Sequence, residues 1–304
     1  MIGITVVVLS RNEEANIGRT LGALRWAKEI LLVDSGSTDR TIELARSAHP
    51  NVRVIHHEFV SHPDQWNFGL DQITTEWALT LDSDYELSPE LSAEIQALTP
   101  TADQSGFWVE FEYRIHGHRL RGSSYPPRIV LFKPANARYV DDGHTQTLWI
   151  RDSVSGELRP PETGGGRTED GGQSVGKTPN IEHRTLNAEF SDNNTHDAQI
   201  GKLAGKIYHD DRKPLGRWIQ DQGRYARLEA RHLLGKPMEQ LSLQDQLRRR
   251  IFFAPPIMFL YLLFVRGLIL DGWPGWFYVG QRTIAELLLS MRLLIETKKL
   301  EDGQ

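Results

Sequence analysis

The 304-residue chain contains no cysteine. This absence excludes disulfides, thiolate metal sites and a cysteine nucleophile, and it fits a protein of a reducing compartment, so we expect a cytoplasmic location. The N-terminus also lacks the marks of an export signal. Met1 leads directly into the apolar run 2–9, with no basic leader and no small-residue cleavage site. We therefore interpret residues 2–9 as a first strand.

Glycine-rich phosphate motifs are not found where a nucleotide fold needs them. No G-x-G-x-x-G follows residues 2–9, which disfavours a dinucleotide-binding fold. The glycines at 164–166 have no strand pattern before them and no helix pattern after them, so a phosphate loop is disfavoured there as well. Any phosphate group that this chain binds is therefore expected to be held mainly through a metal ion.

The first third of the chain alternates between two periodicities. Residues 2–9, 29–33, 52–55 and 76–81 read as short apolar strands, and helical spacing of apolar residues lies between them. Such a strand–helix alternation is typical of a parallel sheet with right-handed crossovers. Two further strands are expected at 106–115 and 128–133.

Three polar clusters follow these strands directly, at residues 10–14, 34–39 and 82–84. Ligands of open α/β sheets bind beyond the carboxyl ends of the strands, so the coincidence of three clusters predicts a binding site there. Asp82 and Asp84 stand one residue apart, and hard oxygen ligands of this kind suit Mg²⁺ or Mn²⁺. The alternative is that both carboxylates only cap the following helix.

These clusters resemble the motifs of a known family, the family 2 glycosyltransferases of the GT-A fold, and especially its branch of lipopolysaccharide-core glucosyltransferases. The resemblance rests on residues 8–14, 33–39, 65–67 and 81–84, in this order and spacing. It implies that Asp84 ligates the metal that bridges the donor diphosphate, with Asp82 beside it near the ribose. The further donor-binding residues that it implies are Ser10, Asn12, Glu13, Asp34, Ser37, Asp39, Gln65 and Asn67.

Two positions depart from the family pattern. Relatives often have a basic residue where Trp66 stands, so the cation expected at the diphosphate is missing or comes from another residue. Many relatives have a His-Glu pair where this chain has His144 followed by Thr145. An inverting transferase needs a base for the acceptor hydroxyl. The candidates are therefore Asp142, Asp141 and His144, with a purely structural His144 as the alternative.

The second half of the chain is less regular. Residues 151–199 hold few aliphatic side chains among many glycines and prolines, which predicts a flexible insertion. The sequence His-Asp-Asp-Arg-Lys at 209–213 is read as closing the acceptor side and touching donor phosphates through Arg212 or Lys213, with a metal triad as the alternative. A helix is predicted from about 216 to 234.

A basic triplet, Arg248 to Arg250, precedes the charge-free run 251–265. This run is shorter than the ~20 residues that cross a bilayer. With Trp273 and Trp276 beyond it, the segment is typical of an element lying in the plane of an anionic membrane surface. The alternative is a buried hairpin or a homodimer interface through the C-terminal helices.

The expected protein is thus α/β, with a GT-A domain at 1–150, an insertion at 151–199 and a helical region at 200–304. Its expected activity is inverting transfer from a nucleotide-diphosphate sugar to a hydroxyl of a lipopolysaccharide-type, cell-envelope or lipid-linked glycan. A divalent metal, Mg²⁺ or Mn²⁺, is the expected cofactor, and no nucleic-acid partner is expected. The expected place is peripheral, on the inner face of the cytoplasmic membrane. Two alternatives stay open: transfer to a polyprenyl phosphate, and a catalytically silent nucleotide-binding scaffold.

Overall fold

The computed structural model describes residues 2–122, 125–141, 146–151, 156–161 and 200–298. Strands and helices alternate through residues 4–97, as the apolar periodicity predicts. The elements of this part are β1 (Ile4–Ser10), α1 (Ile17–Gly22), β2 (Glu29–Asp34), α2 (Thr41–Ala48), β3 (Val52–His56), α3 (His62–Asp71), β4 (Trp77–Asp82), β5 (Tyr85–Leu87) and α4 (Pro89–Ala97).

The middle of the chain is mostly strand. Its elements are β6 (Gly106–Ile115), β7 (His118–Arg119), β8 (Arg128–Phe132), η1 (Pro134–Asn136), β9 (Ala137–Asp141), β10 (Gln146–Arg151), β11 (Leu158–Arg159) and β12 (Ile200–His209). The two strands expected at 106–115 and 128–133 are confirmed, the second one residue shorter.

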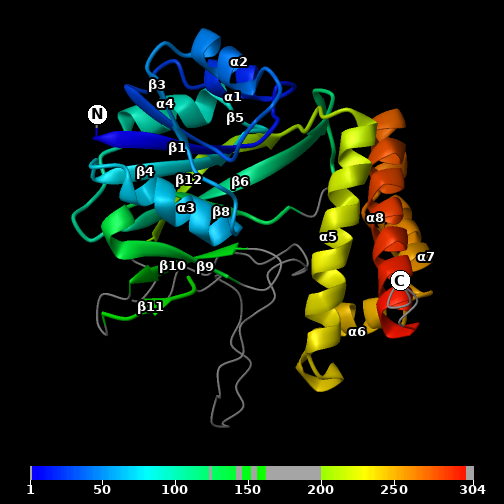
Figure 1. Ribbon diagram of the computed structural model, residues 1–304. Coiled ribbons are helices and arrows are strands. Elements are labelled where there is room, and N and C mark those ends of the chain that lie inside the picture. The colour runs from blue at the N-terminus through cyan, green and yellow to red at the C-terminus, as the bar shows by residue number, and fades with distance from the viewer. Residues whose placement is uncertain (1, 123–124, 142–145, 152–155, 162–199, 299–304) are drawn as a thin grey trace.

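The large sheet runs in the order β3-β2-β1-β4-β8-β6-β12-β5. The four ladders β3–β2, β2–β1, β1–β4 and β6–β12 are parallel, while β8 pairs antiparallel with both β4 and β6. A separate small sheet is made of β9, β10 and β11. In Figure 1 the small sheet lies below the large one, with α3 between them.

Helices cover both faces of the parallel strands, which explains why these strands are apolar throughout. In β1, Val6 and Val8 face one way toward Leu21 of α1. Val7 faces the other way toward Trp66 of α3. Here α3 lies so close to the sheet that a Cβ on Gly69 would stand 2.8 Å from a methyl of Val7, so this position requires glycine.

The large sheet extends beyond the region expected to contain it. Residues 200–304 were expected to be helical, whereas Ile200–His209 form β12 between β6 and β5. The reason is its pattern of burial: Leu203 and Ile207 join the core of the large sheet, and Gly205 permits contact with the backbone of Leu91. A strand that enters the sheet from far along the chain has no local sequence signal for its neighbours.

The last third of the chain forms a helical lobe beside the sheet (Figure 1). In it, α5 and α7 both pack against α8, and Ala230 and Leu233 of α5 meet Leu289 and Leu293 of α8. The helix predicted near 216–234 is confirmed as α5. The elements are α5 (Leu215–Gly235), η4 (Met238–Gln240), α6 (Leu243–Arg249), α7 (Ala254–Leu260), the π-helix η5 (Tyr261–Val265), η6 (Leu268–Asp271) and α8 (Trp273–Lys298).

One member of the basic triplet lies inside this lobe. The Arg248 side chain is 8% exposed and forms ion pairs with Glu286 (2.8 Å), Glu229 (3.4 Å) and Asp245 (3.5 Å). The expectation that all three arginines face a membrane is therefore wrong for Arg248. A charge run does not reveal which of its members points inward, because the partners come from three different helices. No helix in the described part of the chain is long and apolar enough to span a bilayer.

Candidate active site

The register of the parallel strands brings the three polar clusters to one edge. Ser10 at the end of β1 is level with Asp34 at the end of β2, and Leu9 is level with Asp82 at the end of β4. The loops that leave these strands therefore start side by side. Their proximity follows from parallel pairing alone and was predictable from the sequence.

Asp34 fixes the shape of the loop that follows β2. Its side chain is buried, and its Oδ2 accepts the backbone N–H groups of Gly36 (3.0 Å) and Ser37 (2.8 Å). Its Oδ1 accepts the hydroxyls of Ser10 (3.0 Å) and Ser37 (2.5 Å). Both oxygens are thus engaged within the protein, so Asp34 shapes the edge of the site.

The loops after β1 and β2 are tied together by reciprocal bonds. The Asn12 N–H donates to the Ser37 hydroxyl (2.8 Å), and the Asn12 side-chain oxygen accepts the Thr38 N–H (2.7 Å). Asn12 has a φ of +56°, a left-handed conformation that asparagine tolerates better than most residues. The carboxylate of Asp39 accepts the Glu14 N–H (3.2 Å) and both donors of Thr41. Burial disfavours the charge on Asp39, but the bonds from Thr41 outweigh it and lower its pKa.

The polar side chains of α3 are engaged in positioning other segments. Gln65 donates to the backbone oxygens of His57 (3.1 Å) and Glu58 (2.9 Å). Asn67 donates to the Tyr139 oxygen (2.9 Å) and accepts the Tyr139 N–H (3.0 Å), so it clamps β9 to α3. Trp66 is buried and stacks on the Tyr139 ring at 5.3 Å. The indole thus fills the interface between α3 and β9. The cation expected at the donor diphosphate therefore does not come from this position.

Asp82 and Asp84 belong to the tight turn between β4 and β5. Ser83 between them points inward and donates to the Leu9 oxygen (2.5 Å), which turns the two carboxylates away from the core. The helix that follows is capped by Ser88, whose hydroxyl accepts the Leu91 N–H (3.1 Å). The alternative role of Asp82 and Asp84 as helix caps is therefore wrong.

Residues 209–213, which we call the strap, cross from the end of β12 to these strand-end loops. His209 Nε2 lies 3.3 Å from Asp84 Oδ2. Lys213 Nζ lies 2.9 Å from Glu13 Oε1 and 3.5 Å from Asp211. Asn16, fully buried at the start of α1, donates to Asp211 (2.9 Å) and accepts the Arg212 N–H (3.0 Å). The strap is thus bonded to α1 and to the turn that carries Asp84.

The strap places an imidazole beside a carboxylate in an aromatic enclosure. The His209 ring lies 5.1 Å from Tyr85, 4.6 Å from Tyr113 and 4.9 Å from Tyr125, measured between centroids. Burial alone would raise the pKa of Asp84, but the charge and hydrogen bond of His209 and the charge of Lys213 outweigh it and hold the pKa well below its usual range. Asp84 is thus kept ionised.

A divalent cation fits this pair. A carboxylate oxygen and an imidazole nitrogen are both metal ligands, and hard cations take their remaining ligands from waters and substrate phosphates. Among the described residues no group of three or more His, Asp or Glu could hold a metal alone. The alternative triad at 209–211 is not found, because Asp210 turns to Arg212 (2.7 Å) and Asp211 turns to Asn16. Asp84 and His209 would hold the ion together with a ligand.

Besides Asp84, the charges of His62 and Arg128 act on Asp82, and both favour its ionised form. Burial and the neighbouring Asp84 raise the pKa of Asp82. Burial lowers the pKa of His62, which is close enough to Asp82 and to Arg224 of α5 for both charges to act on it. Elsewhere in the site, burial raises the pKa of Glu13 to about 7 although Lys213 opposes the change. His62, Asn16 and Arg224 were not predicted, because their places depend on packing between distant elements.

The candidate bases are only partly described. Asp141 is exposed at the end of β9, opposite Gln146 of β10. Asp142 and His144 lie outside the described residues, as does most of the predicted insertion, of which Leu158–Arg159 form β11. Residues 171–178, which read GGQSVGKT, match G-x-x-x-x-G-K-[ST], a pattern that marks a phosphate loop between a strand and a helix. They too lie outside the described part of the chain.

Comparison with known proteins identifies the family of residues 5–144. Residues 5–144 match the family model described as Glycosyl transferase family 2. They form a glycosyltransferase family 2 domain. This family domain holds the three strand-end clusters, and its mostly parallel sheet with a helical extension confirms the expected GT-A fold class.

The relatives of the family domain are glycosyltransferases by name. An uncharacterised glycosyltransferase of Rickettsia bellii (strain RML369-C) is 30% identical over 155 residues, which are 50% of this chain and 52% of the relative. The lipopolysaccharide core biosynthesis glycosyltransferase LpsC of Rhizobium meliloti (strain 1021) is 30% identical over 108 residues, 34% of this chain and 40% of LpsC. The chain thus matches about half the length of its curated relatives.

Solved structures show weaker similarity. TarS residues 1–349 of S. aureus, in complex with UDP-GlcNAc, match 98% of this chain and 92% of that chain, at 13% identity and a TM-score of 0.45. Glucosyl-3-phosphoglycerate synthase of Mycobacterium tuberculosis, in complex with Mn²⁺, UDP-glucose and phosphoglyceric acid, matches 37% of this chain and 44% of that chain. Its identity is 22% and its TM-score 0.30.

Proposed function

We propose that the protein is a metal-dependent, inverting glycosyltransferase that uses a nucleotide-diphosphate sugar. The observation that supports this most directly is the juxtaposition of Asp84, His209 and Lys213 at the edge where the family domain presents its strand-end loops. A carboxylate and an imidazole suit a divalent cation, and an ammonium beside them suits a diphosphate. The donor-binding role of the loops at 10–14 and 34–39 belongs to the same proposal.

The reaction needs three things from this chain: groups that orient the donor diphosphate, ligands for the cation, and a base. The donor diphosphate is oriented by Lys213 and by the Asp84–His209 pair. A divalent cation held by Asp84 and His209 would neutralise the charge that builds on the departing diphosphate. An acceptor hydroxyl attacks the anomeric carbon from the face opposite the diphosphate, the bond from that carbon to the diphosphate oxygen breaks, and the hydroxyl proton passes to a carboxylate. We assign that base to Asp142 or Asp141, with His144 as its neighbour.

The acceptor class is proposed from the relatives. LpsC is named for lipopolysaccharide core biosynthesis, which suggests a sugar hydroxyl of a lipopolysaccharide-type or lipid-linked glycan. Such an acceptor is presented at the inner face of the cytoplasmic membrane, which is therefore the proposed place of the reaction.

The test begins with donor binding. A thermal-shift screen tests UDP-, GDP- and ADP-sugars, each with and without Mn²⁺. We expect the sugars of one nucleotide to stabilise the protein, and only when the metal is present. Asp84→Asn should remove this metal-dependent shift and all measurable transfer, because the ligand charge is lost. Glu90→Gln, an exposed carboxylate on α4, is the matched control and should bind like the wild type.

Different failures have different meanings. Equal donor binding by wild type and Asp84→Asn would remove the metal site from the proposal. Binding without transfer to any glycan, in the presence of metal, would favour the silent scaffold. Full activity of the double variant Asp141→Asn, Asp142→Asn would favour a polyprenyl phosphate acceptor, which is already anionic and needs no base.

A further inference from the structure

The helical lobe exposes an unusual amount of apolar surface. Of the 22 large apolar side chains exposed in the described part of the chain, 11 lie between residues 252 and 277. Single exposed apolar residues are normal, whereas a contiguous patch marks an interaction site. We call this patch the docking surface. Its central members are Ile257 (45% exposed), Leu260 (53%), Phe264 (63%), Leu270 (71%), Trp273 (54%) and Trp276 (48%).

The docking surface is continuous across two helices. Ile257, Leu260 and Phe264 follow one another at spacings of three and four, so they share the outward side of α7 and η5, while Leu262 and Leu263 are buried on the inward side. Trp276 on the outward side of α8 contacts Phe259 of α7, with ring centroids 6.4 Å apart. The outward stripe of α8 continues through residues 280, 284, 287 and 291.

The charges in this part of the chain are mostly positive. Residues 249–282 contain four arginines and a single aspartate, whereas the whole chain has a net charge of −5. The aspartate, Asp271, has a side chain only 3% exposed and pairs with Arg121 (3.2 Å). Arg250 is exposed next to Phe252 and Phe253, which are 73% and 57% exposed. The surface is therefore apolar in its centre and cationic at its margin.

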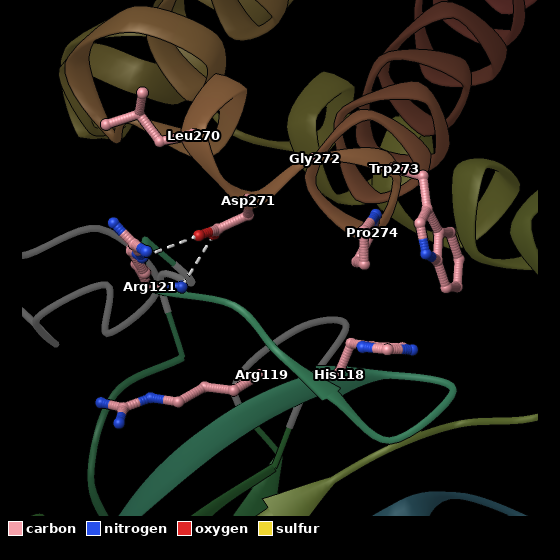
Figure 2. A pocket seen from close by; sticks show the side chains of 8 residues that line it. All are labelled: His118, Arg119, Arg121, Leu270, Asp271, Gly272, Trp273 and Pro274. Atoms are coloured by element: carbon pink, nitrogen blue, oxygen red, sulfur yellow. Dashed lines mark hydrogen bonds and ion pairs between the residues drawn. The ribbon is translucent and has the colours of Figure 1, made fainter.

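A pocket of about 360 Å³ marks one part of that margin (Figure 2). Leu270 and Trp273 lie on the side of the helical lobe, and His118, Arg119 and Arg121 lie on the side of β6 and β7. The guanidinium-bearing side chains of Arg119 and Arg121 are 64% and 72% exposed, while their carboxylate partners are 10% and 3% exposed. Both cations thus face solvent beside apolar side chains, as at a bilayer–water interface.

We propose that the docking surface binds the face of an anionic bilayer, with α7 and α8 lying in the membrane plane. Tryptophan and phenylalanine sit at the headgroup level, and arginines at the margin meet lipid phosphates. A second copy of the chain is a poorer occupant. In a two-fold dimer the same patch faces itself, so the arginines of both copies would be brought together.

The docking surface is coupled to the strand-end site. Tyr278, between Phe277 on the outward side and Val279, is buried and contacts Tyr113 with centroids 4.9 Å apart. Tyr113 in turn contacts His209 at 4.6 Å. Docking would therefore hold the site close to the membrane, where a lipid-linked acceptor is presented. The presentation of a lipid-linked acceptor rests on the proposed function. The binding of the docking surface to lipid does not.

The experiment is flotation of the full chain with vesicles of phosphatidylcholine, with and without phosphatidylglycerol. We expect the protein to float with the anionic vesicles, less so at high salt, and to stay in solution with phosphatidylcholine alone. The double variant Leu260→Glu, Leu270→Glu should bind anionic vesicles about tenfold more weakly, because two charges enter the apolar centre.

A matched control separates this effect from general charge. Leu228→Glu changes a side chain of similar exposure, 47%, on α5, which packs on α8 away from α7. It should float like the wild type, and all three proteins should melt alike. Equal weakening by Leu228→Glu would overturn the proposal, as would wild-type protein that never floats. So would a wild-type dimer in ultracentrifugation that the double variant converts to monomer without any vesicle binding.

The docking experiment needs no donor, so its failure is distinct from failure of the proposed function. Protein that floats but binds no nucleotide sugar would leave the docking surface standing and remove the transferase proposal. Protein that binds a nucleotide sugar with Mn²⁺ but never floats would do the reverse.

Discussion

At the strand-end site, carboxylates and cations are held against one another across loops from β1, β2, β4 and β12. In the helical lobe, one arginine is enclosed among three carboxylates, while others stand at the margin of an apolar surface. The comparison teaches that charge in this molecule serves three purposes. It organises the strand-end loops, it joins three helices of the lobe, and it lies at the margin of the exposed apolar surface. The predictions below separate these purposes by single substitutions.

The largest expected effect on stability belongs to Arg248. Arg248→Gln leaves Glu286, Glu229 and Asp245 without their common cation in a buried place, and we expect it to lower the free energy of unfolding by about 3–5 kcal/mol. Urea denaturation measures this loss. Arg250→Gln, two residues away and exposed, should change stability by no more than about 0.5 kcal/mol. Similar losses in both variants would contradict the enclosed position of Arg248.

The contrast between these two arginines also shows what could not be predicted from the sequence. The triplet and the apolar run after it were visible, and they predicted a surface element. Burial of Arg248 was not visible, because Glu229 lies 19 residues before it and Glu286 lies 38 residues after it, on α5 and α8. Helix periodicity predicts which face is apolar, but it does not say which ionic side chain is drawn into a bundle by partners elsewhere.

The strand-end site was easier to predict from the sequence, for a physical reason. Parallel strands with β-branched runs are recognisable locally, and their carboxyl ends must meet at one edge, so the loops of Ser10, Asp34 and Asp82 could be grouped in advance. The strap could not be placed in this way. His209 meets Asp84 across 125 positions of sequence, after a strand whose partners have no local signal.

The second prediction concerns loop organisation. Asp34→Ala removes the acceptor of two backbone N–H groups and two hydroxyls, and we expect a loss of about 2–3 kcal/mol in stability, with weaker donor binding because the loop loses its shape. Ser10→Ala removes only one of these bonds and should cost about 1 kcal/mol. Calorimetry and urea denaturation test both. Normal stability with weaker donor binding would mean that Asp34 contacts the ligand directly.

The smallest expected effect is the loss of donor affinity on replacing Lys213. This lysine belongs to the strap and takes the place of the cation that is missing at Trp66. We expect Lys213→Met, which keeps the aliphatic stem, to weaken UDP binding in the presence of Mn²⁺ by about tenfold, the scale of one charge-assisted hydrogen bond. Lys213→Arg keeps the charge and should restore most of the affinity. Titration calorimetry with UDP measures this without requiring turnover.

The effect on stability should be smaller than the loss of an ion pair suggests. Lys213 lowers the pKa of Glu13, which burial has raised to about 7. Without the lysine this pKa climbs further, so Glu13 takes up a proton at neutral pH. Asp84 keeps His209 as its partner, and Asp211 keeps the hydrogen bond from Asn16. Lys213→Met should therefore melt close to the wild type while binding UDP more weakly. Unchanged UDP affinity would mean that Lys213 serves only to hold the strap against α1. The diphosphate would then need another cation, and Arg128 at the start of β8 is the cation whose charge lowers the pKa of Asp82.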